Sequence, residues 1–334
     1  MNFMYSPFMM LTTTTMIMST LMALSSTNWV LLWGAMELNL LSFIPIILQT
    51  TKNQEVEGSV KYFLAQALGS ALLLMSSTSL WMPFSSLSNL IPLLLTMAIL
   101  LKLGSVPCHF WYPSVMSSIS WISCLILSTW QKLAPLSILA FILPTKFMSF
   151  IMMMAGMNAL VGGFMGMNQS QMRTIMAYSS IGHIGWMLSL LAIHKPNASI
   201  MYFCIYVVLI SPLFLSMMYL NINSVKQMSK IPSNNTFLHL TMIIILLSLG
   251  GLPPLTGFMP KLMTINILME SMKIVMFMLV IGSVMNLFFY LNICISMMFN
   301  TSQLTPTKYM KENLLSPLIS VATLSLGLTP IILM

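Results

Sequence analysis

The sequence predicts an all-α membrane protein that crosses the bilayer about eleven times. Of its 334 residues, 58% are hydrophobic and only 5% are charged, whereas a soluble domain carries roughly a quarter charged residues. Nearly the whole chain consists of apolar runs long enough to cross the hydrocarbon core, which takes about 20 residues as a helix. Short polar segments separate these runs. We therefore expect a single polytopic membrane domain covering residues 1–334.

The polar breaks fix the order of the expected spans. We place them at 3–23, 28–48, 59–80, 87–104, 119–143, 147–167, 172–193, 198–220, 237–269, 274–299 and 314–334. Residues 1–143 and 147–299 are expected to form two inverted five-helix repeats, and 314–334 one extra C-terminal helix.

Two of these spans contain residues that interrupt a helix. The span 237–269 is too long for one straight crossing, and its middle runs from Gly250 through Pro253 and Pro254. Proline cannot donate to the helical ladder and clashes with the preceding turn. The fourth span ends at Gly104 and is followed by Pro107, which predicts a second break. Breaks five spans apart are typical of transporters built from inverted repeats, and each should line an internal water path.

The charged loops predict the orientation and exclude some functions. Seven basic residues lie in loops on the N-terminal side and three on the other side, so we expect the N-terminus inside. The net charge of +8 comes from thirteen basic residues scattered along the chain, which argues against nucleic-acid binding. The four cysteines occur singly and predict neither disulfides nor a metal site. The 38 methionines favour a mitochondrial gene, and hence a matrix N-terminus and a C-terminus in the intermembrane space.

Four charged residues lie deep within the predicted spans or next to their breaks: Glu37, Lys102, Lys132 and Lys261. Each costs roughly 2.5–3.5 kcal/mol at the bilayer centre, so a chain retains it for a use. A proton relay is one use, although lysine must then release its proton far below its ordinary pKa of about 10.4. Two alternatives stay open. The side chains could snorkel to the interface, as expected for Lys61, or Glu37 could form a static ion pair that fixes helix register.

Two histidines are weaker candidates. His183 falls near the middle of the span 172–193, where it is either a relay or a satisfied core residue. His109 lies beside the first break. Gly162 and Gly166 have a GxxxG spacing, which predicts close helix packing.

Several motifs in one order resemble a known family. They are Trp33 to Leu40, Lys61 to Gln66, Lys102 to Trp111, Thr129 to Pro135, Asn168 to Trp186, and Gly250 to Lys261. The chain resembles the antiporter-like membrane subunits of respiratory complex I, in particular those of animal mitochondria. The resemblance implies that Glu37 pairs with Lys102, that Lys132 is the central relay, and that Lys261 lies on the exit side of a proton route through the mitochondrial inner membrane.

The same resemblance implies partners but no cofactor on this chain. The partners would be the other antiporter-like subunits, the small subunit 4L, and lipid such as cardiolipin. The complex uses NADH, FMN, Fe–S clusters and ubiquinone, but this chain has no glycine-rich dinucleotide motif and no Fe–S cysteine set. Two other functions stay open. A cation/proton antiporter subunit would transport Na⁺, and a non-catalytic scaffold would leave pumping unaltered by Lys132→Ala.

Overall fold

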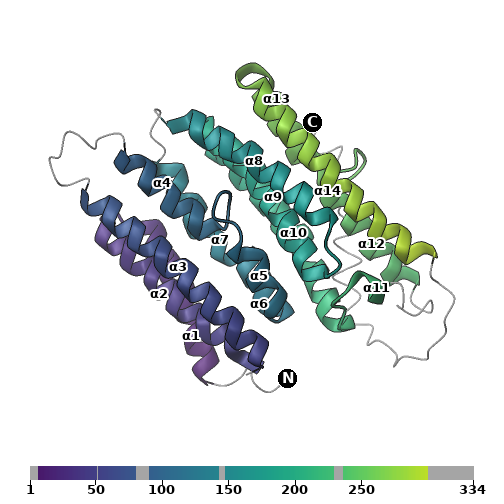
Figure 1. Cartoon of the computed structure of the whole chain (residues 1–334), viewed down its shortest axis with the longest axis horizontal. Helices are drawn as coiled ribbons and strands as arrows, with labels where there is room; N and C mark the ends of the chain where they lie inside the picture. The colour runs from purple at the N-terminus through teal and green to yellow at the C-terminus, as the bar shows by residue number, and fades with distance from the viewer. Residues whose placement is uncertain (1–6, 51, 80–89, 143–146, 229–235, 300–334) are drawn as a thin grey trace. The chain divides into compact units, whose positions relative to one another are not determined.

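The computed structural model describes residues 7–50, 52–79, 90–142, 147–228 and 236–299 (Figure 1). The chain forms two compact units, Met1–Phe150 and Ile151–Met334. The described residues are helical apart from turns, loops and one isolated bridge between Gln171 and Ser224. Among them, eight helical segments are long and apolar enough to cross a membrane, with Trp121–Phe141 counted as one segment. The predicted all-α polytopic fold is confirmed.

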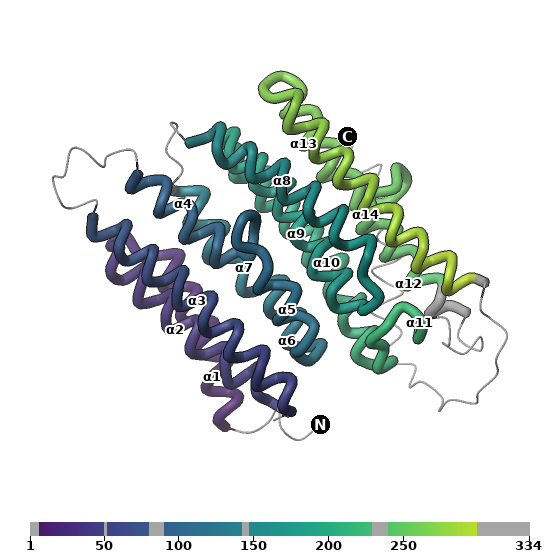
Figure 2. The backbone as a smooth tube through the Cα atoms, in the orientation of Figure 1, coloured from purple at the N-terminus to yellow at the C-terminus, as the bar shows by residue number. Residues whose placement is uncertain are grey.

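Unit 1 begins with three long helices and continues with four shorter ones. The helices are α1 (Pro7–Ser25), α2 (Trp29–Ile47), α3 (Asn53–Ser79), α4 (Leu90–Leu103), α5 (Trp111–Ser118), α6 (Trp121–Ser128) and α7 (Trp130–Ile142), with a 3₁₀ turn at Leu48–Thr50. The first three lie side by side (Figure 2). Helix α3 also packs against α4 and α5, and α7 packs against α4, α6 and α1.

Unit 2 is built around one buried helix. Its helices are α8 (Met148–Met167, which begins just before the unit boundary), α9 (Met172–Ala192), α10 (Pro196–Leu220), α11 (Val225–Met228), α12 (Thr236–Gly250), α13 (Phe258–Ser271) and α14 (Lys273–Phe299). In the most apolar stretch of α9, 94% of the residues are buried, whereas in that of α14 only 33% are. Helix α9 is therefore the core of this unit.

Glycines let α8 approach its two neighbours closely. A Cβ atom at Gly162 would lie 2.6 Å from the carbonyl oxygen of Tyr178 on α9, and one at Gly166 would lie 2.8 Å from the ring of Phe289 on α14. Real Cβ atoms do not approach other atoms so closely. The predicted close packing at the GxxxG spacing is confirmed.

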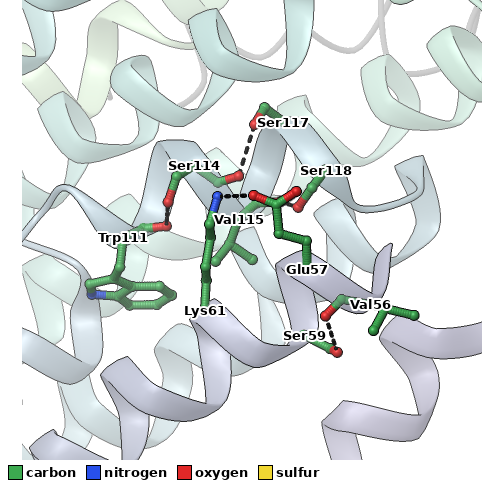
Figure 3. Close-up of polar contacts among 9 residues, drawn as sticks. All are labelled: Val56, Glu57, Ser59, Lys61, Trp111, Ser114, Val115, Ser117 and Ser118. Atoms are coloured by element: carbon green, nitrogen blue, oxygen red, sulfur yellow. Dashed lines mark hydrogen bonds and ion pairs between the residues drawn. The ribbon is translucent and has the colours of Figure 1, made fainter. Parts of the chain in front are cut away.

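Lys61, which is expected to snorkel to the interface, lies on the surface of unit 1. Lys61 Nζ lies 2.6 Å from Glu57 Oε1 one turn earlier on α3, and both side chains are exposed (Figure 3). A Cβ at Gly58, the residue after Glu57, would overlap Ser118 at the end of α5. Glycine therefore allows α3 and α5 to meet closely at this position.

The observed spans follow the predicted ones with one difference. Ten of the eleven predicted spans have helical counterparts, and 314–334 lies outside the described residues. The span predicted at 119–143 as one helix is interrupted at Thr129, which separates α6 from α7. The Thr129 hydroxyl donates to the carbonyl oxygen of Leu125 at 2.7 Å. Such back-bonding by threonine bends helices, and one polar residue in an apolar span is too weak a signal to predict it.

Candidate functional site

The break after α4 has a regular backbone cap. Gly104 adopts φ +69°, a conformation that glycine takes without the steric cost of a Cβ. Its N–H donates to the carbonyl of Leu101, and the N–H of Ser105 donates to that of Leu100, both at 3.0 Å. This pair of bonds is a Schellman motif, which ends the helix and satisfies two of its last carbonyls. Lys102 lies in this last turn with only 6% of its surface exposed.

Neutral side chains satisfy further carbonyls at this helix end. Gln66 Nε2 on α3 donates to the carbonyl oxygen of Lys102 at 3.1 Å, and Trp111 Nε1 donates to that of Leu101 at 3.0 Å. A Cβ at Gly69 would lie 2.9 Å from Lys102 Cγ, so α3 also leaves space for the lysine stem. The helix end is thus held without using the Lys102 ammonium as its cap.

Glu37 acts on Lys102 through its charge. It lies half-buried near the middle of α2, and its carboxylate interacts electrostatically with the Lys102 ammonium. Among the described residues, these two form no ion pair closer than 4.0 Å. The static ion pair considered for Glu37 and Lys102 is therefore not formed, and the carboxylate influences the lysine from a distance.

Lys132 follows the interruption at Thr129. It lies in the first turn of α7 and is 2% exposed. Its Nζ lies 5.2 Å from the centroid of the Tyr112 ring, in a cation–π arrangement. Pro135, one turn further on, has no N–H to continue the ladder. Snorkelling to the interface is excluded for Lys132, since its side chain is enclosed by the protein.

A chain of neutral hydrogen bonds lies next to these lysines. Tyr62 OH donates to Gln131 Oε1 at 3.4 Å, and Gln131 Nε2 donates to Asn39 Oδ1 at 3.1 Å. It joins α3, α7 and α2: Gln131 directly precedes Lys132, and Asn39 is two residues after Glu37. None of these three residues was predicted to belong to the site. Their signal was present, because uncharged polar residues within apolar spans usually bond across helices.

His109 lies in the segment between α4 and α5. It is 5% exposed, its Nδ1 lies 3.3 Å from the carbonyl oxygen of Pro107, and its ring lies 4.1 Å from that of Phe110. Its Nε2 is buried without a hydrogen-bond partner in the part of the chain that the structure describes.

The break after α12 repeats the cap of the first break. Gly251 adopts φ +86°, its N–H donates to the carbonyl of Ser248 at 3.0 Å, and the N–H of Leu252 donates to that of Leu247 at 3.4 Å. These are the same two bonds in the same register as those around Gly104. The helices before the two predicted breaks thus end in the same way, with a Schellman motif whose glycine has a left-handed conformation.

Lys261 closes this second break with its charge. From the first turn of α13, its Nζ donates to the carbonyl oxygens of Gly250 at 2.7 Å and Leu249 at 3.3 Å. The side chain is 5% exposed. A Cβ at Gly251 would lie 2.7 Å from this Nζ, so glycine at that position also makes room for the ammonium. Carbonyls at a helix C-terminus attract a cation.

His183 lies inside unit 2, near the middle of α9. It is 5% exposed, its Nδ1 lies 2.9 Å from the hydroxyl of Tyr202 on α10, and its ring centroid lies 5.1 Å from that of Tyr206. Gly182 leaves space for Asn286 of α14, whose Nδ2 would lie 2.7 Å from a Cβ there. The histidine is therefore a hydrogen-bonded core residue, and the bond to Tyr202 fixes the orientation of its ring.

The predicted site residues fall into two groups. Unit 1 contains Glu37, Lys102, Lys132 and His109, and unit 2 contains His183 and Lys261. Each of the three lysines lies within about one turn of a helix interruption. In the described residues there is no cluster of three or more metal-ligating side chains. The shared feature of the site is a buried lysine at a helix end.

Comparisons with known proteins agree with this arrangement. The sequence model of the NADH:quinone oxidoreductase/Mrp antiporter transmembrane family matches residues 26–288. NADH-ubiquinone oxidoreductase chain 2 of Lumbricus terrestris is 65% identical over 335 residues, covering 100% of both chains. The protein of the same name from Oryctolagus cuniculus is 37% identical over 331 residues, covering 95% of each.

Two solved structures share the fold. A chain of respiratory complex I from Thermus thermophilus has a TM-score of 0.85 and 22% identity, over 96% of this chain and 77% of that one. A chain of the Mrp complex from Dietzia sp. has a TM-score of 0.81 and 17% identity, over 97% and 74%. The family match and the full-length relatives show that the chain belongs to the NADH:quinone oxidoreductase/Mrp antiporter transmembrane family.

Proposed function

We propose that this chain is the proton-translocating membrane subunit of an NADH:ubiquinone oxidoreductase. Protons pass through Glu37, Lys102, Lys132 and Lys261, with His183 as an additional relay. The observation that carries this proposal is that each buried lysine lies at an interruption of a membrane helix. Such interruptions persist in a bilayer only where protein or water satisfies the exposed backbone, and half-helix ends are where transporters bind ions.

The helix ends give the lysines different electrostatic surroundings. Lys102 lies at the C-terminal end of α4, where the helix dipole favours a cation, whereas Lys132 lies at the N-terminal end of α7, where it opposes one. The carboxylate of Glu37 adds attraction at Lys102. Neutralising Glu37 removes that attraction and favours transfer of the proton from Lys102 toward Lys132. The chain thus supplies a switch and an acceptor within one unit.

The repeated cap supports the two inverted repeats as part of this proposal. Identical backbone bonds around Gly104 and Gly251 place a buried lysine next to each. Moving one charge across the membrane takes about 2.3 kcal/mol per 100 mV, and in this proposal redox chemistry elsewhere in the complex supplies that work.

The remaining features of the proposal concern the surroundings of the chain. NADH, FMN, Fe–S clusters and ubiquinone are bound by other subunits. The partners are the other antiporter-like subunits, the small subunit 4L, and lipid such as cardiolipin. The membrane is the mitochondrial inner membrane, with the N-terminus in the matrix. The names of the relatives at 65% and 37% identity and the multiple apolar helices support this assignment.

The test is proton pumping per NADH oxidised by reconstituted complex carrying Glu37→Gln. The matched control is Glu57→Gln, which removes an exposed carboxylate from the same unit. We expect a lowered pumping ratio for Glu37→Gln only, in samples with equal amounts of assembled complex. Unchanged pumping would show that Glu37 has a structural role, and pumping that requires Na⁺ would favour the cation/proton antiporter instead.

A further inference from the structure

Tyr112 places an aromatic face next to the central lysine. It lies in the first turn of α5 and is 1% exposed, and its ring centroid is 5.2 Å from Lys132 Nζ. A cation within about 6 Å of a ring face is attracted by the quadrupole of the ring, and the attraction grows when both groups are removed from water. The ring therefore favours the protonated form of Lys132.

The attraction of the ring for the Lys132 ammonium opposes the effect of the α7 helix dipole. Lys132 lies in the first turn of α7, where the helix dipole disfavours a positive charge. The aromatic face offsets part of that repulsion. A displacement of the ring would consequently change how tightly Lys132 holds its proton, with no change in Lys132 itself.

Tyr112 is also packed against the break that follows Lys102. A Cβ at Gly104 would lie 2.9 Å from Tyr112 Cβ and 3.2 Å from its ring. The preceding residue, Trp111, donates its indole N–H to the carbonyl oxygen of Leu101 in the last turn of α4, and its ring centroid lies 5.6 Å from that of Tyr112. The ring beside Lys132 therefore cannot shift independently of the helix end that carries Lys102.

We propose that Tyr112 is a positioning residue that couples the helix break after Lys102 to the proton held by Lys132. A rearrangement at Gly104 moves the ring, and the moved ring lowers or restores the attraction for the Lys132 ammonium. This inference rests on the proposed proton-translocating function and adds a residue that the sequence analysis did not assign. Proton transfer between the two lysines is thereby linked to backbone geometry at the break.

The effect of the Tyr112 ring on Lys132 must be distinguished from the effects of other titratable groups nearby. On the helices packed against α7, these are Lys102 on α4 and Cys124 on α6, and the described residues of α1 have none. Tyr62 on α3 also reaches α7, because its hydroxyl donates to Gln131. Glu37 on α2 acts on Lys102. A substitution at Tyr112 replaces none of these groups, and Tyr112→Phe keeps the ring that packs against Gly104. A change seen only when the ring is lost therefore identifies the ring as its source.

The experiment compares Tyr112→Phe with Tyr112→Leu in reconstituted complex, and measures proton pumping per NADH across a pH series. Phenylalanine keeps the ring face and removes the hydroxyl, whereas leucine removes the face. The matched control is Phe43→Leu, which removes a fully buried ring of the same unit that contacts Tyr62. In Tyr112→Leu, we expect the alkaline side of the pH profile of pumping to move to lower pH by about one unit, because Lys132 binds its proton about tenfold less tightly. In Tyr112→Phe and Phe43→Leu, the profile should stay in place.

Equal profiles for Tyr112→Phe and Tyr112→Leu, or an equal shift in Phe43→Leu, would overturn the role of the ring. If Tyr112→Leu lowers the amount of assembled complex, Tyr112→Met is measured instead, because its longer side chain fills more of the space. Lys132→Ala is measured in parallel. Unaltered pumping in Lys132→Ala would overturn the proposed function itself, whereas lost pumping in Lys132→Ala with equal Tyr112 profiles would overturn only this inference.

Discussion

The ammonium of Lys261 lies 2.7 Å from the carbonyl oxygen of Gly250 and acts as the side-chain cap of the helix before it. The corresponding break in unit 1 uses the neutral donors Gln66 and Trp111 instead. Two breaks with the same backbone cap thus differ in whether the buried charge takes part in holding the helix end. In unit 2, loss of the charge and loosening of the break are expected to occur together.

Lys261→Met should loosen the break between α12 and α13. The substitution removes two hydrogen bonds from a charged donor to buried carbonyls, each worth about 1.5–3 kcal/mol. Hydrogen exchange of peptides covering residues 247–257 should become at least tenfold faster. Lys273→Met is the control, because Lys273 is exposed at the start of α14. Unchanged exchange would show that the Schellman bonds alone hold the break.

Gln66→Leu should destabilise the end of α4. The change leaves the buried carbonyl of Lys102 without its side-chain donor, at a cost of about 1–3 kcal/mol. The midpoint of thermal inactivation of NADH-driven pumping should fall. Gln54→Leu, at an exposed position of the same helix, should leave that midpoint in place. Equal midpoints for the two variants would mean that another donor replaces Gln66.

Tyr202→Phe should impair proton movement through unit 2. It removes only the hydroxyl that lies 2.9 Å from His183 Nδ1, so the imidazole loses the partner that fixes its orientation. Proton pumping per NADH should fall several-fold while the amount of assembled complex stays the same. Tyr219→Phe, which alters an exposed tyrosine on the same helix, should pump normally. Normal pumping in both variants would assign His183 to the core alone.

Gly162→Ala should destabilise the packing of α8 on α9. The added methyl would lie 2.6 Å from the carbonyl oxygen of Tyr178, and overpacking of this kind costs about 1–3 kcal/mol. Gly34→Ala is a matched control, since a Cβ there meets nothing within 4 Å and alanine favours the helix by up to about 1 kcal/mol. The yield of assembled complex should fall for Gly162→Ala only, and equal yields would contradict the close approach.

Much of the fold was predictable because the bilayer imposes a simple rule. Apolar length gave the spans, and the prolines after Gly251 and Gly104 gave the two breaks. The interruption at Thr129 was missed, because neither a proline nor a glycine lies at that position and Pro135 is six residues further on. The Thr129 hydroxyl donates to the carbonyl of Leu125, and apolar length does not reveal such a bond.

The charged members of the site were predictable for the same reason, whereas their partners were not. A charge such as Lys132 is conspicuous in an apolar span because its insertion is costly. The Lys132 ammonium faces the ring of Tyr112, the Lys261 ammonium faces the carbonyl of Gly250, and the amide of Gln66 bonds the backbone carbonyl of Lys102. Rings and amides occur throughout membrane helices, and every residue has a carbonyl. Only the folded arrangement distinguishes the few that lie beside these lysines.

The burial of α9 affects how natural variation in this chain should be interpreted. Positions facing lipid accept exchanges among Leu, Ile, Met and Val, because lipid tails are as apolar as these side chains and adapt to their shape. Helix α9 has almost no such positions, since 94% of the residues in its most apolar stretch are buried. Harmful substitutions should therefore concentrate in residues 172–192 whatever their chemistry. Damage at His183 becomes evidence of proton transfer only when it exceeds the damage at equally buried neighbours such as Ser180 and Ser189.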